Sequence, residues 1–412
     1  MSKRKRGNGE GSIFNQGGRW RGVVTLKDGG RKWFSAATRH EVADQLRDAL
    51  KDQSLGLLVA PKKQTVGQFL TWWLNDVVKP SARPKTMQFY EYQTRIHLIP
   101  GLGDIPVQRL TAQRVQAFLN DRLAQKSERT KRQITARTVR HMHRTLCTAL
   151  NVAVKYKVVA VNVALATDPP AAARPTVSYM SVEQARAFLE TAKGDRLYAL
   201  YATVLALGLR LGEGLGIAWD DIDLGSGRFN IQQALQRLSK KLYPEKSGLQ
   251  LVEPKGGYSA RVVTLPAVTI SALRHHQALQ AEEQRWAGSR WNNQWGLAFT
   301  GKLGKPLDER SVLRWFQKLL ALAELPKMRL HDLRHSAVAI LLAQHVNIKA
   351  ISELLGHSSV AFTLQVYGHL LEGVKRETAD TMNAALSGVA ATVAAKPPNQ
   401  DLETMPVSTP NI

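Results

Sequence analysis

A proline- and alanine-rich segment, ATDPPAAARPTVS at 166–178, constrains the fold more than any other feature of the sequence. Proline fixes φ and removes a backbone donor, so a run of this kind interrupts both helices and strands. The segment predicts a linker between residues 64–165 and residues 179–386, each long enough to bury a core of its own. A chain of 412 residues is too long for one ordinary core, which agrees with this division.

The first 63 residues predict a separate small domain. Residues 11–36 contain short β-branched and aromatic runs broken by GG and DGG, which is typical of three strands joined by tight turns. A helical pattern follows at 40–53. The predicted strands carry the basic residues Arg19, Arg21, Arg31 and Lys32 beside Trp20 and Trp33. We expect the basic residues to contact DNA, while the tryptophans could either join them or form the core.

Residues 64–165 predict a helical domain. Helical patterns occur at about 66–78, 84–98, 111–125 and 134–155, with a Pro- and Gly-containing loop at 100–111. The last of these helices has an apolar face and a basic face, as expected of a helix lying along DNA phosphates. Its basic face carries Arg137, Arg140, His141 and Arg144.

The charge of the chain favours an anionic partner. The formal net charge is +24, from 57 Lys and Arg against 33 Asp and Glu. Counted by segment, residues 1–63 carry +8 and residues 64–175 carry +11, so the excess lies mainly before the linker. A bias of this size is typical of nucleic-acid binding rather than of a merely soluble surface.

The rest of the composition limits other classes of protein. The single cysteine, Cys147, excludes an internal disulfide and a cysteine-based zinc site, and fits a reducing cytoplasm. No apolar run reaches the roughly 18 residues that a membrane helix needs. Residues 387–412 are expected to form a flexible tail, and the N-terminal KRKR could be a phosphate-binding arm.

The third unit, 179–386, combines helices with a β-rich insertion at 228–264. Its apolar helical pattern at 196–217 contains Arg210 and Glu213, three residues apart, near its end. A charged side chain that emerges from an apolar helix needs a partner of opposite charge. Strand patterns at 228–235 and 259–266 are expected to pair, and Lys255 lies in the turn before the second strand. A surface lysine there is usually only solvated, but in a cleft it could protonate a leaving oxygen.

The stretch HDLRHS at 331–336 brings His331 and Arg334 to one face of a helix, where both could address one phosphate. Its HExxH-like spacing also suggests a zinc site formed by His331 and His335. Asp332 is too short for the general-base role in that motif, and Arg334 would place a fixed cation beside the metal. Downstream, His357 follows a glycine that should end a helix, and Tyr367 lies ten residues further on.

The motifs GLRLGEGLGIAWDDID, PKGGYSAR, HDLRHS and LGHSSVAFTLQVYGH resemble those of the tyrosine recombinases, in particular phage-type integrases. The resemblance covers nearly the whole chain. It implies a catalytic set of Arg210, Lys255, His331, Arg334 and His357, with Tyr367 as the nucleophile. It also implies that Glu213 orients Arg210, and that His335 is a packing residue without a catalytic role.

The resemblance implies a multidomain fold that is mainly α with small β-sheets: an arm-type DNA-binding domain (1–63), a helical core-binding domain (64–165), the linker (166–178), a mixed α+β catalytic domain (179–386) and a tail. It implies cutting and rejoining of DNA through a 3′-phosphotyrosyl intermediate, without a cofactor or metal. His331 would act as the base, and Lys255 would protonate the 5′ oxygen.

The implied partners are double-stranded DNA at core and arm attachment sites, three further copies of the chain in a tetramer, a host DNA-bending protein and an excision factor. The implied location is the nucleoid of a bacterial host, without a membrane. Two other functions remain open from the residues: a type IB topoisomerase, which shares the chemistry, and a DNA-binding regulator that does not cut. The arm-like first domain and the presence of Tyr367 argue against them.

Overall fold

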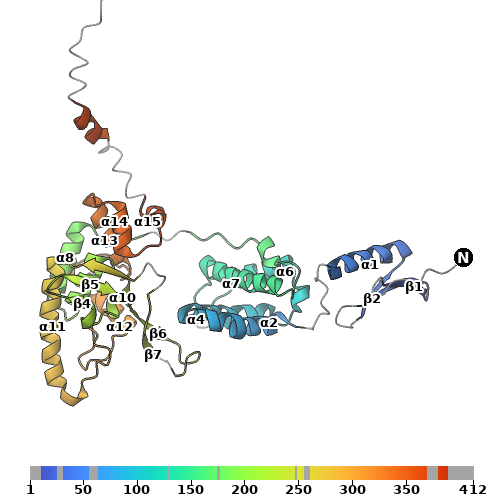
Figure 1. Ribbon diagram of the computed structural model, residues 1–412, viewed down its shortest axis with the longest axis horizontal. Helices are drawn as coiled ribbons and strands as arrows, with labels where there is room; N and C mark the ends of the chain where they lie inside the picture. Colours follow the sequence, from blue (N-terminus) through green and yellow to red (C-terminus); the bar gives the residue numbers. More distant parts are fainter. Residues whose placement is uncertain are drawn as a thin grey trace, which may run out of the picture. The chain divides into compact units, whose positions relative to one another are not determined.

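The computed structural model describes residues 11–25, 31–54, 64–127, 130–173, 177–245, 248–254, 260–368 and 379–387. The chain divides into two compact units at residue 175, inside the predicted linker, and the first unit also takes in residues 241–244. Figure 1 shows the order of their helices and strands along the chain. None of the helices in the described ranges has both the length and the apolar character that crossing a membrane requires.

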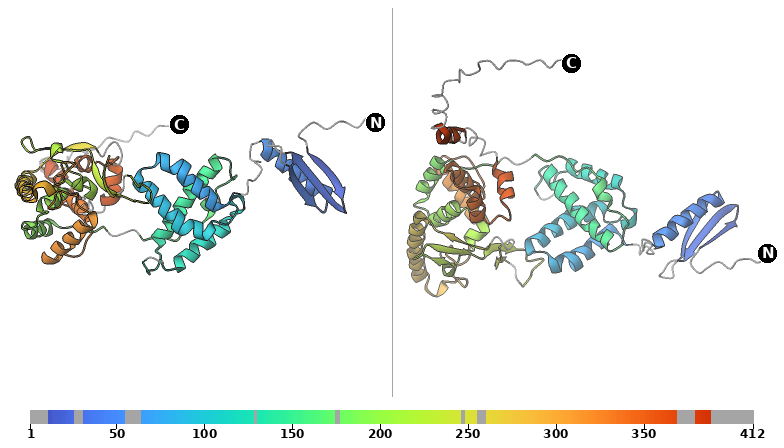
Figure 2. Two further views of the ribbon diagram at one scale, coloured as in Figure 1. Left: turned by 90° about the horizontal axis from the view of Figure 1, so that it is seen from below. Right: turned by 45° about the horizontal axis from the view of Figure 1, so that its top comes forward.

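The N-terminal segment forms the predicted three-stranded sheet with one helix. Strands β1 (Ser12–Gln16), β2 (Arg19–Thr25) and β3 (Arg31–Ala36) are antiparallel in the order β1-β2-β3, and α1 spans Arg39–Ser54. Gly17 and Gly18 both have positive φ, which allows the tight turn between β1 and β2. Both views of Figure 2 show α1 lying along one face of this sheet.

The helical part of the first unit contains all four predicted helices. They are formed by α2 (Val66–Trp72) with η1 (Trp73–Val78) and α3 (Lys79–Ser81); α4 (Pro84–Gln93) with η2 (Thr94–Leu98) and α5 (Ile99–Leu102); α6 (Ala112–Ala124); and α7 (Ala136–Lys155). Two short 3-10 turns, η3 (Val107–Arg109) and η4 (Val163–Ala166), complete the unit. Threonine side chains cap α2, α6 and α7, so an orphan amide at each of these helix starts is satisfied.

The second helix is longer than its sequence pattern predicts. It was expected to end near 98, before the Pro- and Gly-containing loop, but α5 continues it to Leu102. Pro100 lies near the start of α5, which directly follows η2. The loop therefore begins about three residues later than the glycine and proline content suggests.

The first part of the predicted linker is hydrogen-bonded to the helical unit. The Gln116 side chain on α6 accepts from the Asp168 amide at 2.8 Å and donates to the Asp168 carbonyl at 3.1 Å. The Thr167 hydroxyl donates to the Ala164 carbonyl at 2.7 Å. These bonds fix the chain on leaving η4, so the described part of the segment, up to residue 173, follows α6 and α7 closely.

The second unit begins with helices and a small sheet. Helices α8 (Val182–Ala192), α9 (Tyr198–Leu207) and α10 (Leu211–Leu215) lead through the 3-10 turn η5 (Trp219–Asp221) to strands β4 (Ile222–Asp223) and β5 (Arg228–Ile231). The sheet order is β4-β5-β8, with β8 at Arg261–Thr264. The predicted pairing of the strands at 228–235 and 259–266 is therefore confirmed for its first half.

The insertion between these strands forms its own hairpin. Strand β6 (Ala234–Leu238) pairs with β7 (Gly248–Val252), so the predicted strand at 228–235 is broken in two. The break lies at Gln232 and Gln233, whose amide groups both donate to the Asp221 carboxylate. Two side chains turned to one acceptor cannot keep the alternation of a strand, and the backbone changes direction there.

The remaining helices of the second unit follow β8 along the chain. They are α11 (Ala267–Ala287), the short turn η7 (Gly288–Arg290), α12 (Glu309–Leu322), α13 (Asp332–Ala343), α14 (Ile348–Leu355), α15 (Val360–Tyr367) and a helix at 379–387. Helix α9 is apolar on all sides and packs against α8, α11 and α13, as expected of a helix inside a core. An aromatic cluster of Phe188, Tyr201 and Phe316 lies in this core.

The predicted helix at 196–217 is interrupted in the structure. Helix α9 ends at Gly208, which adopts a left-handed conformation (φ 59°), and α10 begins three residues later. A Cβ on Gly208 would lie 2.6 Å from Cδ2 of Leu355, a fully buried side chain at the end of α14. The glycine therefore serves two purposes, the left-handed turn and the close approach of α14.

We expect the substitution Gly208→Ala to lower the free energy of unfolding of the second unit. The left-handed backbone costs about 1 to 2 kcal/mol for any residue with a Cβ, and the contact with Leu355 adds to this. Gly296→Ala is the matched control, because Gly296 has φ 58° and open space around its Cβ position. Urea unfolding should give a clearly larger loss for Gly208→Ala, and equal losses would contradict the packing role.

Candidate functional site

The site centres on Arg334, in the first turn of α13. Its side chain is buried, with 3% exposure. One guanidinium nitrogen, Nη1, donates to the Gly208 carbonyl at 2.7 Å, and the other, Nη2, donates to the Leu355 carbonyl at 2.8 Å. These carbonyls stand at the C-terminal ends of α9 and α14, which both end at a left-handed glycine, Gly208 or Gly356. The buried cation thus lies at the negative ends of two helices.

The environment of Arg334 disfavours its charge but does not remove it. Burial, followed by repulsion from the Arg210 cation, lowers the pKa of Arg334 to about 9. At neutral pH the guanidinium therefore still carries a proton. A cation held in such a water-poor place gains most from a bound anion, since the attraction is little screened by solvent.

Arg210 is held by Glu213 at the start of α10. The Arg210 Nη1 donates to Glu213 Oε1 at 2.6 Å, and the Arg210 amide donates to Glu213 Oε2 at 3.1 Å. The Glu213 side chain is only 2% exposed. Burial by itself raises the pKa of this carboxyl, but the Arg261 and Arg210 cations hold the pKa below its ordinary value. Glu213 is therefore ionised and fixes Arg210, which is the role that the resemblance implies.

A third arginine, Arg261 on β8, joins this group, and the sequence analysis did not identify it. Its side chain is 8% exposed; Nη2 donates to Glu213 Oε2 at 3.3 Å and Nε donates to the Leu354 carbonyl at 2.6 Å. A signal was present in the sequence. Strand periodicity puts Arg261 on the same face as Val263 and Leu265, which are buried, so a charge at 261 requires a partner inside.

Three guanidinium groups therefore surround one carboxylate. The Arg210, Arg261 and Arg334 cations outnumber Glu213 by two, and all of them act electrostatically on the same site. An excess of fixed positive charge with little water is an anion-binding arrangement. Planar guanidinium groups suit phosphate oxygens in particular.

His357 borders this positive group from the chain that follows α14. Its Nδ1 lies 2.8 Å from the Thr363 hydroxyl, and the edge of Phe362 packs on the ring at 4.9 Å between centroids. Burial, with repulsion from Arg334 and Arg210, lowers the pKa of His357 to about 4. The imidazole is therefore neutral at physiological pH, and it can donate from Nε2 when Thr363 donates to Nδ1.

Tyr367, at the end of α15, is buried with 2% exposure beside Val338, Ile351 and Leu355. Its hydroxyl lies 2.6 Å from Nδ1 of His335. The resemblance implied that His335 is a packing residue without a catalytic role. In the structure His335 on α13 instead contacts the Tyr367 hydroxyl at the end of α15.

Burial raises the pKa of Tyr367 to about 12, and the nearby Arg334 cation opposes this only in part. The phenol is therefore neutral in this conformation. His331 stands at the start of α13 and its ring meets that of His335 edge-on, with centroids 5.1 Å apart. Desolvation of the ring and repulsion from His335 lower the pKa of His331 as well. Burial also lowers the pKa of His335, so both histidines are neutral near pH 7.

The structure brings together most of the predicted catalytic residues. Arg210, Glu213, Arg334 and His357 lie around one positive group, Tyr367 lies in the adjoining core, and His331 lies at its exposed edge. The predicted Lys255 lies outside the described residues. In the described part of the chain, no three His, Cys, Asp or Glu side chains are arranged to hold a metal ion.

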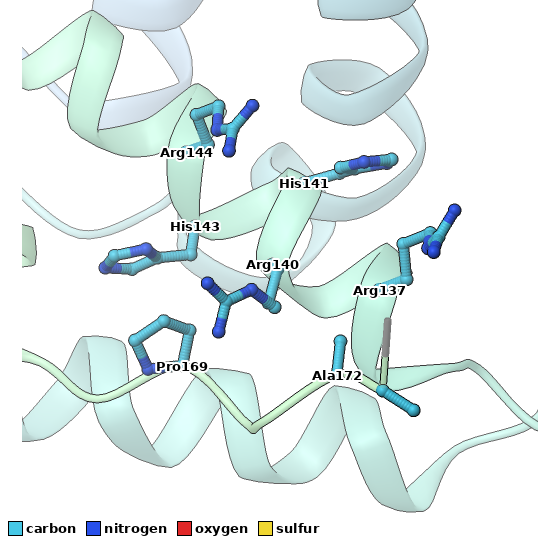
Figure 3. Close-up of a pocket in the computed structure, with 8 residues that line it drawn as sticks. Arg137, Arg140, His141, His143, Arg144, Pro169 and Ala172 are labelled. Carbon is cyan, nitrogen blue, oxygen red and sulfur yellow. The ribbon is translucent and has the colours of Figure 1, made fainter. Parts of the chain in front are cut away.

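The basic face predicted on the fourth helix borders a hollow. The hollow measures about 270 Å³ and lies between α7 and the chain at 169–173. It is lined by Arg137, Arg140, His141, His143, Arg144, Pro169, Ala172 and Ala173. Figure 3 shows the basic side chains leaving α7, with Arg140 directed toward the segment that contains Pro169. The three predicted arginines therefore share one surface.

The four basic residues predicted in the first domain do not share one surface. The strand register places Arg19, Arg21 and Arg31 on one face, together with the exposed Trp33. Helix α1 covers the other face, and Lys32 belongs to that face, with its Nζ 5.5 Å from the centre of the Phe34 ring. Adjacent residues of a strand point to opposite sides, which separates Arg31 from Lys32.

Two family models match the chain. The model of the phage integrase family matches residues 178–373, and that of the phage integrase N-terminal SAM-like domain matches residues 65–123. Together they cover well over half of the sequence. The first match contains every residue of the positive group together with His331, His335 and Tyr367.

Similar proteins agree with this match. A "Tyrosine recombinase XerC-like" protein of Caldanaerobacter subterraneus subsp. tengcongensis is 29% identical over 366 residues, covering 86% of this chain and 91% of that one. An "Integrase" of Saccharopolyspora erythraea is 28% identical over 435 residues, covering 92% and 98%. A solved Tn1549 transposon integrase in complex with transposon right-end DNA has a TM-score of 0.62 and 19% identity, covering 79% of this chain and 100% of that one.

These relatives are recombinases and integrases, so they do not favour the topoisomerase and regulator alternatives. The solved integrase supports the fold, which is mainly helical with small antiparallel sheets. The chain belongs to the phage integrase family of tyrosine recombinases and is a site-specific recombinase.

Proposed function

We propose that this recombinase integrates and excises the DNA of a phage or another mobile element at attachment sites, through a 3′-phosphotyrosyl intermediate at Tyr367. The observation that carries the proposal is the buried excess of positive charge around Arg334, adjacent to a tyrosine. A phosphodiester is a monoanion, and attack on its phosphorus develops further charge on the nonbridging oxygens. Guanidinium groups fixed in advance stabilise that charge most effectively.

The roles of the residues follow from this charge. Arg210 and Arg334 would bind the nonbridging oxygens, and His357 would donate a hydrogen bond to one of them. The Tyr367 oxygen would form a bond to phosphorus as the bond from phosphorus to the 5′ oxygen breaks. His331 is proposed to take the phenolic proton and Lys255 to protonate the 5′ oxygen, both by the family resemblance.

Attack requires Tyr367 to leave the position described here. Its hydroxyl is buried and bound to His335, and the raised pKa keeps it protonated. We propose that binding of the scissile phosphate and assembly with other copies release α15, so that the phenol reaches the phosphate. The pKa of the phenol should then fall, because the two catalytic arginines would lie close to its oxygen.

Two surfaces are proposed to hold DNA away from the reacting phosphate. One is the arginine face of α7, and the other is the face of the N-terminal sheet that carries Arg19, Arg21 and Arg31. Both lie in the segments with the largest net positive charge, +8 and +11. We propose that the first contacts the core site and the second an arm site.

Recombination joins two duplexes, so the chain is proposed to act as a tetramer on DNA. The helix at 379–387 is exposed throughout, with Met382 and Leu386 one turn apart, and docking on a neighbouring copy would cover these side chains. A host DNA-bending protein and an excision factor are proposed as further partners. The proposed location is the bacterial nucleoid.

The first prediction from the proposed function concerns the nucleophile. We expect Tyr367→Phe to bind DNA normally but to form no covalent adduct with a nicked duplex carrying the crossover site, identified from the DNA that flanks the gene. Tyr201→Phe is the matched control, since Tyr201 is also buried and its hydroxyl has no hydrogen-bond partner among the described residues. Denaturing gel electrophoresis measures the adduct. An adduct formed equally well by Tyr367→Phe would show that another group attacks.

A second prediction concerns metal ions. Adduct formation should continue at an unchanged rate in excess EDTA, because Arg210 and Arg334 would supply the positive charge that a metal provides in other phosphoryl transfers. The measurement is the single-turnover rate with and without the chelator at constant ionic strength. A loss that added Mg²⁺ or Zn²⁺ restores would refute this assignment of the charge.

A third prediction tests the open face of the N-terminal sheet. Arg31→Gln should weaken binding of arm-site DNA and reduce the slope of log affinity against log salt by about 0.9, the value for one phosphate contact. Lys32→Gln should change both much less, because Lys32 lies on the face with α1. Fluorescence anisotropy at several salt concentrations measures both quantities. Equal effects of the two substitutions would contradict the assignment of the face.

A further inference from the structure

Two of the hydrogen bonds of Arg261, to Glu213 and to the Leu354 carbonyl, link three elements of the site. It lies on β8, and the face of the strand that it shares with Val263 and Leu265 is turned inward. Its Nη2 bonds to Glu213, which holds Arg210, and its Nε bonds to the Leu354 carbonyl of α14. The second bond is short, at 2.6 Å, and the side chain is 8% exposed. Both bonds are therefore sheltered from water.

The second bond completes the C-terminal end of α14. The last four carbonyls of a helix have no partner within it. Here the Ser352 carbonyl accepts from the His357 amide at 3.1 Å, and the Glu353 carbonyl accepts from the Gly356 amide at 3.0 Å. The Leu354 and Leu355 carbonyls accept from the side chains of Arg261 and Arg334, respectively. Two amides and two arginines thus satisfy all four groups.

This arrangement makes the end of α14 part of the anion site. His357 directly follows Gly356, the residue that caps the end of α14, and the His357 amide is one of the four donors. Arg261 therefore fixes the backbone that places His357, while its other bond fixes the carboxylate that places Arg210. These two bonds go to Glu213 and to the Leu354 carbonyl, so through them Arg261 acts on Arg210 and His357 indirectly.

We propose that Arg261 is a positioning residue of the recombinase. It fixes the Arg210–Glu213 pair and the His357 backbone at the relative positions that the scissile phosphate requires. The inference rests on the proposed function of that site. The proposed role of Arg261 depends on the geometry of its guanidinium group as well as on its charge. Lysine keeps the charge but has a single nitrogen, which cannot reproduce two bonds made from different corners of a planar guanidinium.

The test compares Arg261→Lys with the wild type in single-turnover adduct formation on the nicked duplex. We expect the rate to fall by about 10- to 100-fold, because displacement of a catalytic group by about 1 Å has effects of this order. The dissociation constant for the duplex should change less than about threefold, since the proposed DNA-binding surfaces lie elsewhere. Arg274→Lys is the matched control, as Arg274 is exposed and also donates to a main-chain carbonyl, that of Leu224.

A second substrate separates positioning from a general loss of structure. Replacing the scissile phosphate with a methylphosphonate removes its negative charge, so correct placement of the arginines matters less. The ratio of wild-type to Arg261→Lys rates should therefore shrink to within a few-fold on this substrate. Both ratios are measured with the same two preparations, so an unfolded fraction of either protein cancels when the two ratios are compared. Equal ratios on both substrates would overturn the inference.

The outcomes also distinguish this inference from the proposed function. If wild-type protein forms an adduct that depends on Tyr367, and Arg261→Lys forms it at the same rate, only the role of Arg261 is wrong. If no adduct depends on Tyr367, the proposed chemistry of the site fails, whatever Arg261 does.

Discussion

The hydrogen bonds of the Arg334 guanidinium to two helix ends are the interaction on which the site depends. Burying a cation costs several kcal/mol unless its donors are satisfied and its charge is balanced. Here the Gly208 and Leu355 carbonyls accept two of the donors, and the Glu213 carboxylate balances part of the charge. Helices α9, α13 and α14 must therefore meet at one point. The left-handed glycines at 208 and 356 let two of them end there.

The buried site carries unbalanced positive charge until an anion binds. Three arginines and one glutamate leave two positive charges in excess, and burial lowers the pKa of Arg334 toward 9. A phosphate diester would relieve part of this repulsion on binding. Tyr367, the proposed nucleophile, is buried, protonated and bound to His335 in this structure. The proposed mechanism therefore requires Tyr367 to leave this position before it can attack a bound phosphate.

Much of the architecture follows from the sequence. Glycine pairs and alternating residues predicted the N-terminal sheet, and apolar periodicity predicted the four helices of the next segment. Thr65 and Ser181 form capping boxes at the starts of α2 and α8, as Ser or Thr followed three residues later by Gln favours. The functional family followed from four motifs in order, which the matching family models confirm. Local patterns and specific motifs are the kinds of information that a single sequence carries well.

Other features depend on contacts between distant segments, and the sequence did not reveal them. Gly208 interrupts an apolar helix because Leu355, far along the chain, packs against it. His335 contacts Tyr367 only because α13 and α15 come together. Arg261 was not identified from the sequence, although its alternation with Val263 indicated an inward side chain. Partners of buried charges are set by tertiary structure, and they are the part that local patterns do not specify.

The central claim is that the positive group around Arg334 delivers a DNA phosphate to Tyr367. Mapping the attachment point of DNA on the wild-type protein tests it most directly. Trypsin cleavage after Lys349 and Lys375 gives a peptide of residues 350–375, in which Tyr367 is the one tyrosine. After nuclease digestion, mass spectrometry should find the residual nucleotide on this peptide, at Tyr367. Attachment to a different peptide, or to a serine or histidine within this one, would contradict the account.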